Sequence, residues 1–143
     1  LFLLVGPGVI SIDQVQEAVA DSSRFNVFEL ADSALAGDQA RVIRILHGLQ
    51  AEGIEPVLVT WALAKDVRLL AAVSGNRNAA DYVLKQAGVW QNRLPLYKSC
   101  LSRHSTKRFS RMLQRCAKID EITKGQPGNV WDELQTLGYL LAS

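Results

Sequence analysis

The chain has 143 residues, of which 48% are apolar and 21% charged, and its formal net charge is +2. This composition is that of a globular domain and excludes an intrinsically disordered protein. A chain of this length buries roughly 70% of its extended surface on folding, so it needs neither disulfides nor structural metals.

The first residues are apolar but do not form a recognisable targeting segment. The run LFLLV (1–5) is shorter than the ~20 apolar residues that span a membrane, and it lacks the basic flank and cleavage site of a signal peptide. Because the chain begins at Leu1 without Met, we expect it to be a fragment of a longer protein. Without an export signal, we expect a cytoplasmic location and no membrane contact.

Helix-capping residues divide the first half of the chain. Ser11, Asn26 and Asp38 each precede apolar residues at helical spacing, and their side-chain oxygens can accept bonds from free N–H groups of a first helical turn. Glycine tolerates the left-handed conformation that often follows a helix. We therefore predict one helix after Ser11, one ending near Gly37 and one closed by Gly53.

The stretch AEGIEPVLVTWALAKDVR (51–68) predicts a central helix. Proline suits a first helical position, so the helix begins at Pro56. A helix that is apolar on every side is enclosed by other helices. The residues that cover all sides here are Val57, Leu58, Val59, Trp61, Ala62, Leu63 and Ala64.

Four more helices follow. Asn78 begins a short one that ends at Gly88, another runs from about Pro95 to Arg103, a long one follows Ser105, and a last one follows Asn129. The long helix carries one apolar stripe, made of Phe109, Met112, Leu113, Cys116, Ile119 and Thr123. No segment alternates like a strand, so we predict an all-α bundle of about eight helices with short loops.

The sequence contains few groups suited to catalysis or cofactor binding. It has no G-x-x-x-x-G-K-[ST] loop for a nucleotide, and His47 and His104 lack a partner at metal-ligand spacing. We expect no cofactor, no metal and no catalytic residue. Cys100 and Cys116 are interpreted as reduced core thiols. The alternative is a thiol enzyme that uses Cys100 and His104, four residues apart.

Basic residues are concentrated in one region. Between Tyr82 and Lys118 the chain has nine Lys or Arg and no Asp or Glu, whereas residues 1–66 contain nine acids and four bases. Four of the bases share one side of the helix after Ser105 and are called the basic face: Lys107, Arg111, Arg115 and Lys118. Such a face can bind phosphates, pair with an acidic subunit or face water. All three alternatives stay open.

Four stretches, in this order, resemble the C-terminal part of the delta-subunit family of bacterial DNA polymerase III clamp loaders. They are SIDQVQEAVADSSRFNVFELADSALAGD (11–38), LHGLQAEGIEPVLVTWALAKDVRLL (46–70), VWQNRL (89–94) and VWDELQTLGYLL (130–141). From the first to the last they span residues 11–141, nearly the whole chain. VWQNRL and the terminal VW-x-EL segment are the most particular to this family.

The resemblance implies a domain plan and a set of partners. Residues 1–22 would be the end of a helical lid domain of an AAA+-like protein, and residues 23–143 a helical collar domain. In such loaders the collars of five subunits form a ring, so the implied partners are ATPase subunits of the gamma/tau type and of the delta-prime type. The sliding clamp would be contacted by an N-terminal domain outside this chain, and DNA only indirectly. The family is non-catalytic and does not hydrolyse ATP.

The resemblance also suggests contact residues. Aromatic residues and Arg dominate the energetics of protein interfaces, so the candidates are Trp90, Arg93, Tyr97 and Tyr139. The alternative for Trp90 and Tyr97 is that both fill the core beneath the segment broken by Pro95. The competing function is a nucleic-acid-binding domain that uses the basic face.

Overall fold

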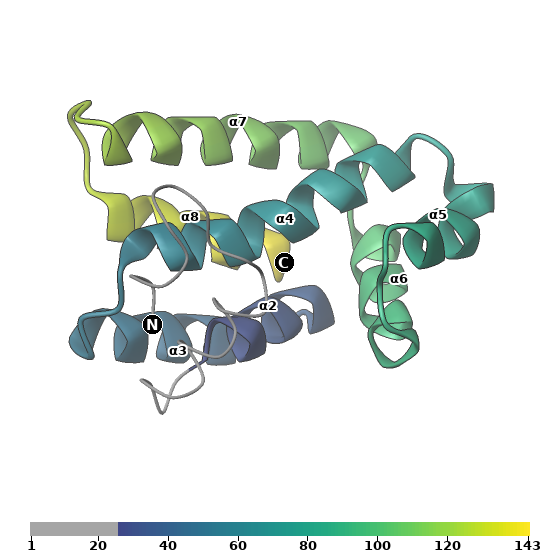
Figure 1. Cartoon of the computed structure of the whole chain (residues 1–143), viewed down its shortest axis with the longest axis horizontal. Coiled ribbons are helices and arrows are strands. Elements are labelled where there is room, and N and C mark those ends of the chain that lie inside the picture. The colour runs from purple at the N-terminus through teal and green to yellow at the C-terminus, as the bar shows by residue number, and fades with distance from the viewer. Residues whose placement is uncertain (1–25) are drawn as a thin grey trace, which may run out of the picture.

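The computed structural model describes residues 26–143, and every regular element in that part is helical (Figure 1). The elements are α2 (Val27–Ala36), α3 (Gln39–Ala51), α4 (Pro56–Ser74), the 3-10 turn η2 (Arg77–Ala79), α5 (Ala80–Gln86), the 3-10 turn η3 (Gln91–Arg93), α6 (Leu94–Arg103), α7 (Thr106–Thr123) and α8 (Val130–Leu141). The all-α prediction is confirmed. The helix expected after Ser11 and the proposed boundary near residue 22 lie outside the described residues.

Side-chain caps fix most helix starts. The side-chain oxygens of Asn26, Asp38, Ser105 and Asn129 each accept a hydrogen bond from an N–H in the following first turn, at 2.7 to 3.2 Å. Gly37 ends α2 in the left-handed conformation, with φ 87°. These caps confirm the predicted starts of α2, α3, α7 and α8.

The start of α5 differs from the prediction. Asn78 lies within η2 and caps nothing, and α5 begins at Ala80. The guanidinium of Arg77 donates to the backbone carbonyls of Leu101 and His104 at the end of α6. These bonds join η2 to residues 24 and 27 positions later in the chain, which local sequence does not reveal.

Helix α4 runs through the middle of the bundle (Figure 1). It packs along α7 on one side and against α2 on another, and it also contacts α8. The remaining helices close the core, since α2 packs on α3 and α6, and α8 packs on α3 and α7. Helices α5 and α6 lie at one end of the molecule in Figure 1.

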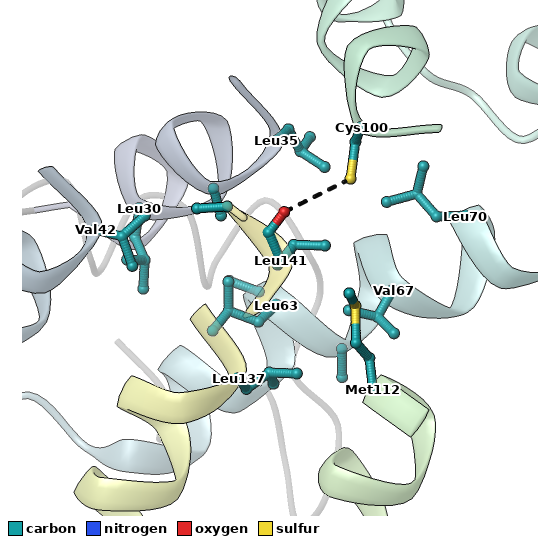
Figure 2. Packing of buried hydrophobic residues seen from close by; sticks show 14 of the residues in the cluster. Leu30, Leu35, Val42, Leu63, Val67, Leu70, Cys100, Met112, Leu137 and Leu141 are labelled. Atoms are coloured by element: carbon teal, nitrogen blue, oxygen red, sulfur yellow. Dashed lines mark hydrogen bonds between the residues drawn. The ribbon is translucent and has the colours of Figure 1, made fainter. Parts of the chain in front are cut away.

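The core forms where α4 meets its neighbours. Leu63 and Val67 of α4 are fully buried, and Figure 2 shows them among Met112 of α7 and Leu137 and Leu141 of α8. Burial of an aliphatic side chain of this size stabilises the fold by about 1.5–3 kcal/mol. The prediction that α4 is the central helix is therefore confirmed for the side that carries Leu63 and Val67.

The prediction that α4 is enclosed on every side is wrong. Val57 is 55% exposed and Trp61 is only partly buried. Val57, Trp61, Lys65 and Arg68 recur every three or four residues, so they lie along one side of the helix. This side is open within residues 26–143. Conversely, Asp66, which interrupts the apolar run, is buried with 1% exposure.

Within residues 26–143, no helix combines the length and the apolar character needed to cross a membrane.

Candidate protein-binding groove and the basic face

A groove lies beside the open side of α4. Its volume is about 760 Å³, and we call it the Trp90 groove. It is bounded by α2, α4 and the connection from α5 to α6. Its lining residues are Phe28, Asp32, Lys65, Arg68, Leu69, Ala72, Ala87, Gly88, Val89, Trp90, Arg93 and Tyr97.

Trp90 is the most exposed large apolar residue among residues 26–143, at 75%. Gly88 takes a left-handed conformation (φ 87°) after α5, and the N–H of Val89 donates to the carbonyl of Leu84 at 3.0 Å. The chain then passes through extended Trp90 into η3. This tight turn places the indole at the surface. Trp90 is therefore available for contact and does not fill the core.

Arg93 anchors the wall of the groove through two carboxylates. Its Nη2 lies 2.8 Å from Oδ1 of Asp32 on α2 and 3.3 Å from Oδ2 of Asp66 on α4. Burial by itself would lower the pKa of Arg93, but the negative charge of Asp66 and the other partners raises it overall. The guanidinium thus stays charged and ties α2, α4 and the Trp90 turn together.

Tyr97 lies beneath Arg93 rather than at the surface. Its side chain is 1% exposed, and its hydroxyl donates a hydrogen bond to Oδ1 of Asp66. Arg93 stands over the Tyr97 ring at 5.3 Å. Burial and the Asp66 charge raise the pKa of Tyr97, so it stays neutral. Tyr97 is therefore a core residue that supports Arg93, which is the second alternative considered for it.

Tyr139 lies at a different surface. It is 49% exposed and lines a shallow groove of about 470 Å³ between α3 and α8, together with Ile43, Thr136 and Leu140. The two grooves share no lining residue. The four predicted contact residues are therefore divided: Trp90, Arg93 and Tyr97 lie together, and Tyr139 is apart from them.

The basic face is partly neutralised within the chain. Arg115 and Lys118 pair with opposite oxygens of Glu133 on α8, at 3.0 and 3.2 Å. Lys107 and Arg111 are exposed and form no salt bridge with any residue from 26 to 143. Two of the four cations thus remain available to an anionic partner.

The Cys100–His104 pair is not arranged as a nucleophile and base. The Sγ of Cys100 lies 4.0 Å from the carbonyl oxygen of Leu141, and Nε2 of His104 donates to that same oxygen at 2.9 Å (Figure 2 shows the cysteine contact). Burial raises the pKa of Cys100 to about 12, so the thiol stays protonated. Cys116 is also a buried free thiol, as predicted.

Metal ligands do not gather in the described part of the chain. No group of three His, Cys, Asp or Glu side chains is placed to hold an ion there. His47 is exposed on α3, and His104 is buried with its Nδ1 lacking a hydrogen-bond partner among residues 26–143.

Sequence reasoning missed Lys65 and Arg68, which line the groove, and the buried Asp66, which binds Arg93 in its wall. They were interpreted only as the polar end of an apolar run. Their spacing already indicated different positions on the helix, because Lys65 and Arg68 share one side while Asp66 points about 100° away from Lys65. Only the structure shows that Asp66 faces Arg93, 27 residues later in the chain.

Comparison with known proteins agrees with this architecture. Residues 27–143 match the family described as "Processivity clamp loader gamma complex DNA pol III C-term". DNA polymerase III subunit delta of Escherichia coli K12 is 32% identical over 146 residues, covering 99% of this chain and 42% of that protein. The same subunit of Haemophilus influenzae Rd is 28% identical over 149 residues, covering 96% and 43%. The chain thus spans less than half the length of these relatives. It belongs to the family of C-terminal domains of the DNA polymerase III clamp loader gamma complex.

Proposed function

We propose that this chain is a non-catalytic assembly domain that holds a delta-type subunit in the clamp loader, which loads the sliding clamp onto primed DNA. Residues 23–143 would form the collar unit, and residues 1–22 the end of the preceding lid domain. Its partners would be the ATPase subunits of the gamma/tau type and the delta-prime-type subunit. The sliding clamp and DNA would be contacted by parts outside this chain.

The exposure of Trp90 is the observation that carries the proposal. The indole is 75% exposed and adjoins a groove whose wall includes Phe28, Leu69 and Val89, and contiguous exposed apolar patches mark protein contacts. Tryptophan is also enriched among the residues that dominate binding energy. The family match supplies the kind of assembly.

Co-purification tests this proposal. The chain is mixed with purified gamma-type and delta-prime-type subunits at micromolar concentration and separated by size-exclusion chromatography. We expect the chain to elute in a complex, and Trp90→Ala to weaken it. A folded wild-type chain that elutes alone would overturn the assignment.

A nucleic-acid-binding function is the second candidate, and the exposed pair Lys107 and Arg111 favours it. Each lysine or arginine that neutralises a phosphate gives a measurable salt dependence of affinity. Titration of fluorescently labelled primed DNA at two salt concentrations tests it. Micromolar binding that weakens with salt and is lost in Lys107→Ala/Arg111→Ala would support this function, and absence of binding would exclude it.

A further inference from the structure

We propose that the Trp90 groove receives an amphipathic helix of a neighbouring clamp-loader subunit, one that carries two acidic residues a turn apart beside a large apolar residue. This inference rests on the proposed assembly function and names the chemistry of one partner segment.

The charges of the groove select an acidic partner. Lys65 and Arg68 of α4 line it, and neither forms a salt bridge with any residue from 26 to 143. The acid in the lining, Asp32, is already bound to Arg93. Counting Asp66 behind the wall, three cations of the groove stand against two carboxylates, and Lys65 and Arg68 are the cations without an ion pair among residues 26–143.

The spacing of the two cations fits a helix. Residues three apart on a helix are neighbours on its surface, so Lys65 and Arg68 stand one above the other. Carboxylates three or four residues apart on a facing helix would meet both. Lys65 is also held in place, because its Nζ lies 5.1 Å from the centre of the Trp61 ring.

The rest of the groove provides an apolar contact. Phe28, Leu69 and Val89 are partly buried against the core, and Trp90 projects beside them. An apolar side chain placed between the two acids of a partner helix would cover the indole. Nucleic acid fits less well, since the apolar wall formed by Phe28, Leu69 and Val89 faces the same space.

The groove is preorganised, which lowers the cost of binding. Arg93, three residues after Trp90, is bound to Asp32 on α2 and Asp66 on α4. The turn that carries the indole is thus fixed to both opposing helices before a partner arrives. Binding to a fixed surface avoids the entropy lost when loops are ordered.

Quantitative binding of the chain to the purified gamma-type ATPase subunit tests the inference. We expect Trp90→Ala and Lys65→Glu/Arg68→Glu each to weaken the complex at least about tenfold, and the charge-reversed variant to lose most of the salt dependence. Tyr82→Ala and Arg44→Glu are the matched controls, because both residues are exposed and lie outside the groove. Circular dichroism confirms that each variant is folded.

Zero-length crosslinking identifies the partner chemistry directly. A carbodiimide joins the Lys65 amine to a contacting carboxylate as an amide and is itself converted to a urea. Peptide mass spectrometry should find Lys65 linked to an Asp or Glu of the gamma-type subunit. Crosslinks from other lysines alone, or a link to a second copy of this chain, would overturn the inference.

The outcomes separate this inference from the proposed function. A wild-type chain that fails to bind any loader subunit overturns both. Binding that survives the groove variants but is lost in Tyr139→Ala overturns the groove assignment and leaves the assembly function standing. Groove variants that change DNA binding but not subunit binding also overturn the groove assignment.

Discussion

Helix α6 has an arginine at each end, and the two are held in opposite ways. Arg93 stands at the N-terminal end, where the helix dipole is unfavourable to a cation, and it is bound to the carboxylates of Asp32 and Asp66. Arg103 is the last residue of the helix, where the dipole favours a cation. It donates to the backbone carbonyls of Leu35 at 2.9 Å and Ser143 at 3.2 Å.

The difference shows how the same residue type can serve binding at one end and stability at the other. The Arg93 junction depends on one buried charge, Asp66, and lies in the wall of the Trp90 groove. The Arg103 junction spreads its bonds over the ends of α2, α6 and α8 and lines no groove described above. We therefore expect changes at the first to affect stability and partner binding, and changes at the second to affect stability alone.

Asp66→Ala should give the largest effect. It leaves the buried Tyr97 hydroxyl without its acceptor and Arg93 with Asp32 as its remaining carboxylate, and each group that loses a buried partner costs about 1–3 kcal/mol. Chemical denaturation measures the loss, and binding to the gamma-type subunit should weaken as well. The control is Asp81→Ala, which breaks an exposed pair with Lys98 and should cost at most about 1 kcal/mol. Equal losses in the two variants would contradict the buried-charge interpretation.

Arg103→Ala should have the next largest effect. Hydrogen bonds from a charged group contribute about 1.5–3 kcal/mol. Water can reach the helix-end carbonyls that the substitution leaves without Arg103. We therefore expect the unfolding free energy, measured by denaturation, to fall by about 2 kcal/mol. Partner binding by the folded variant should equal that of wild type. Arg44→Ala on the exposed side of α3 should change neither quantity. Weakened binding in Arg103→Ala would show that the two ends of α6 are not independent.

Tyr97→Phe should have a smaller effect at the Arg93 end. The substitution removes one donor from Asp66 and the long bond, 3.5 Å, that the hydroxyl accepts from Arg93, but it leaves the Arg93–Asp66 pair and the ring packing in place. Loss of a hydrogen bond to a charged group predicts about 1–2 kcal/mol of destabilisation by denaturation. Tyr139→Phe, at a half-exposed tyrosine, should be neutral. A neutral Tyr97→Phe would mean that Arg93 alone satisfies Asp66.

The helices were predictable from sequence because their signals are local. The caps at Asn26, Asp38, Ser105 and Asn129 act within one turn, and the apolar spacing acts within one helix. The predicted cap at Asn78 was wrong, since Asn78 lies within η2, whose Arg77 bonds to carbonyls at the end of α6.

The groove was predictable only in part. Trp90 and Arg93 could be selected by residue type, but the groove joins α2, α4 and the α5–α6 connection, which are distant in sequence. No spacing rule brings Asp66 to Arg93, so its burial cannot be inferred without the fold. The same holds for Glu133, which pairs with two of the four cations of the basic face.

The smallest expected effect is a pH dependence at the Arg103 end. Burial lowers the pKa of His104, and the neighbouring charges of Arg108 and Arg103 lower it further, while its bond to Leu141 opposes this. The unfolded chain therefore binds a proton more readily than the folded chain. Stability should be full above the unfolded pKa of about 6.5 and should decline as the pH falls below it.

His104→Gln tests this dependence. Urea denaturation of the variant between pH 5 and 7.5 should show a flatter dependence of the unfolding free energy on pH than wild type, because one proton-binding group is removed from the unfolded chain. The exposed His47, changed to Gln, is the matched control. If His104→Gln kept the wild-type slope, the acid sensitivity would arise elsewhere. The stability of the Arg103 end would then not depend on the protonation of His104, and this end would differ even more from the Arg93 end, which depends on charged groups.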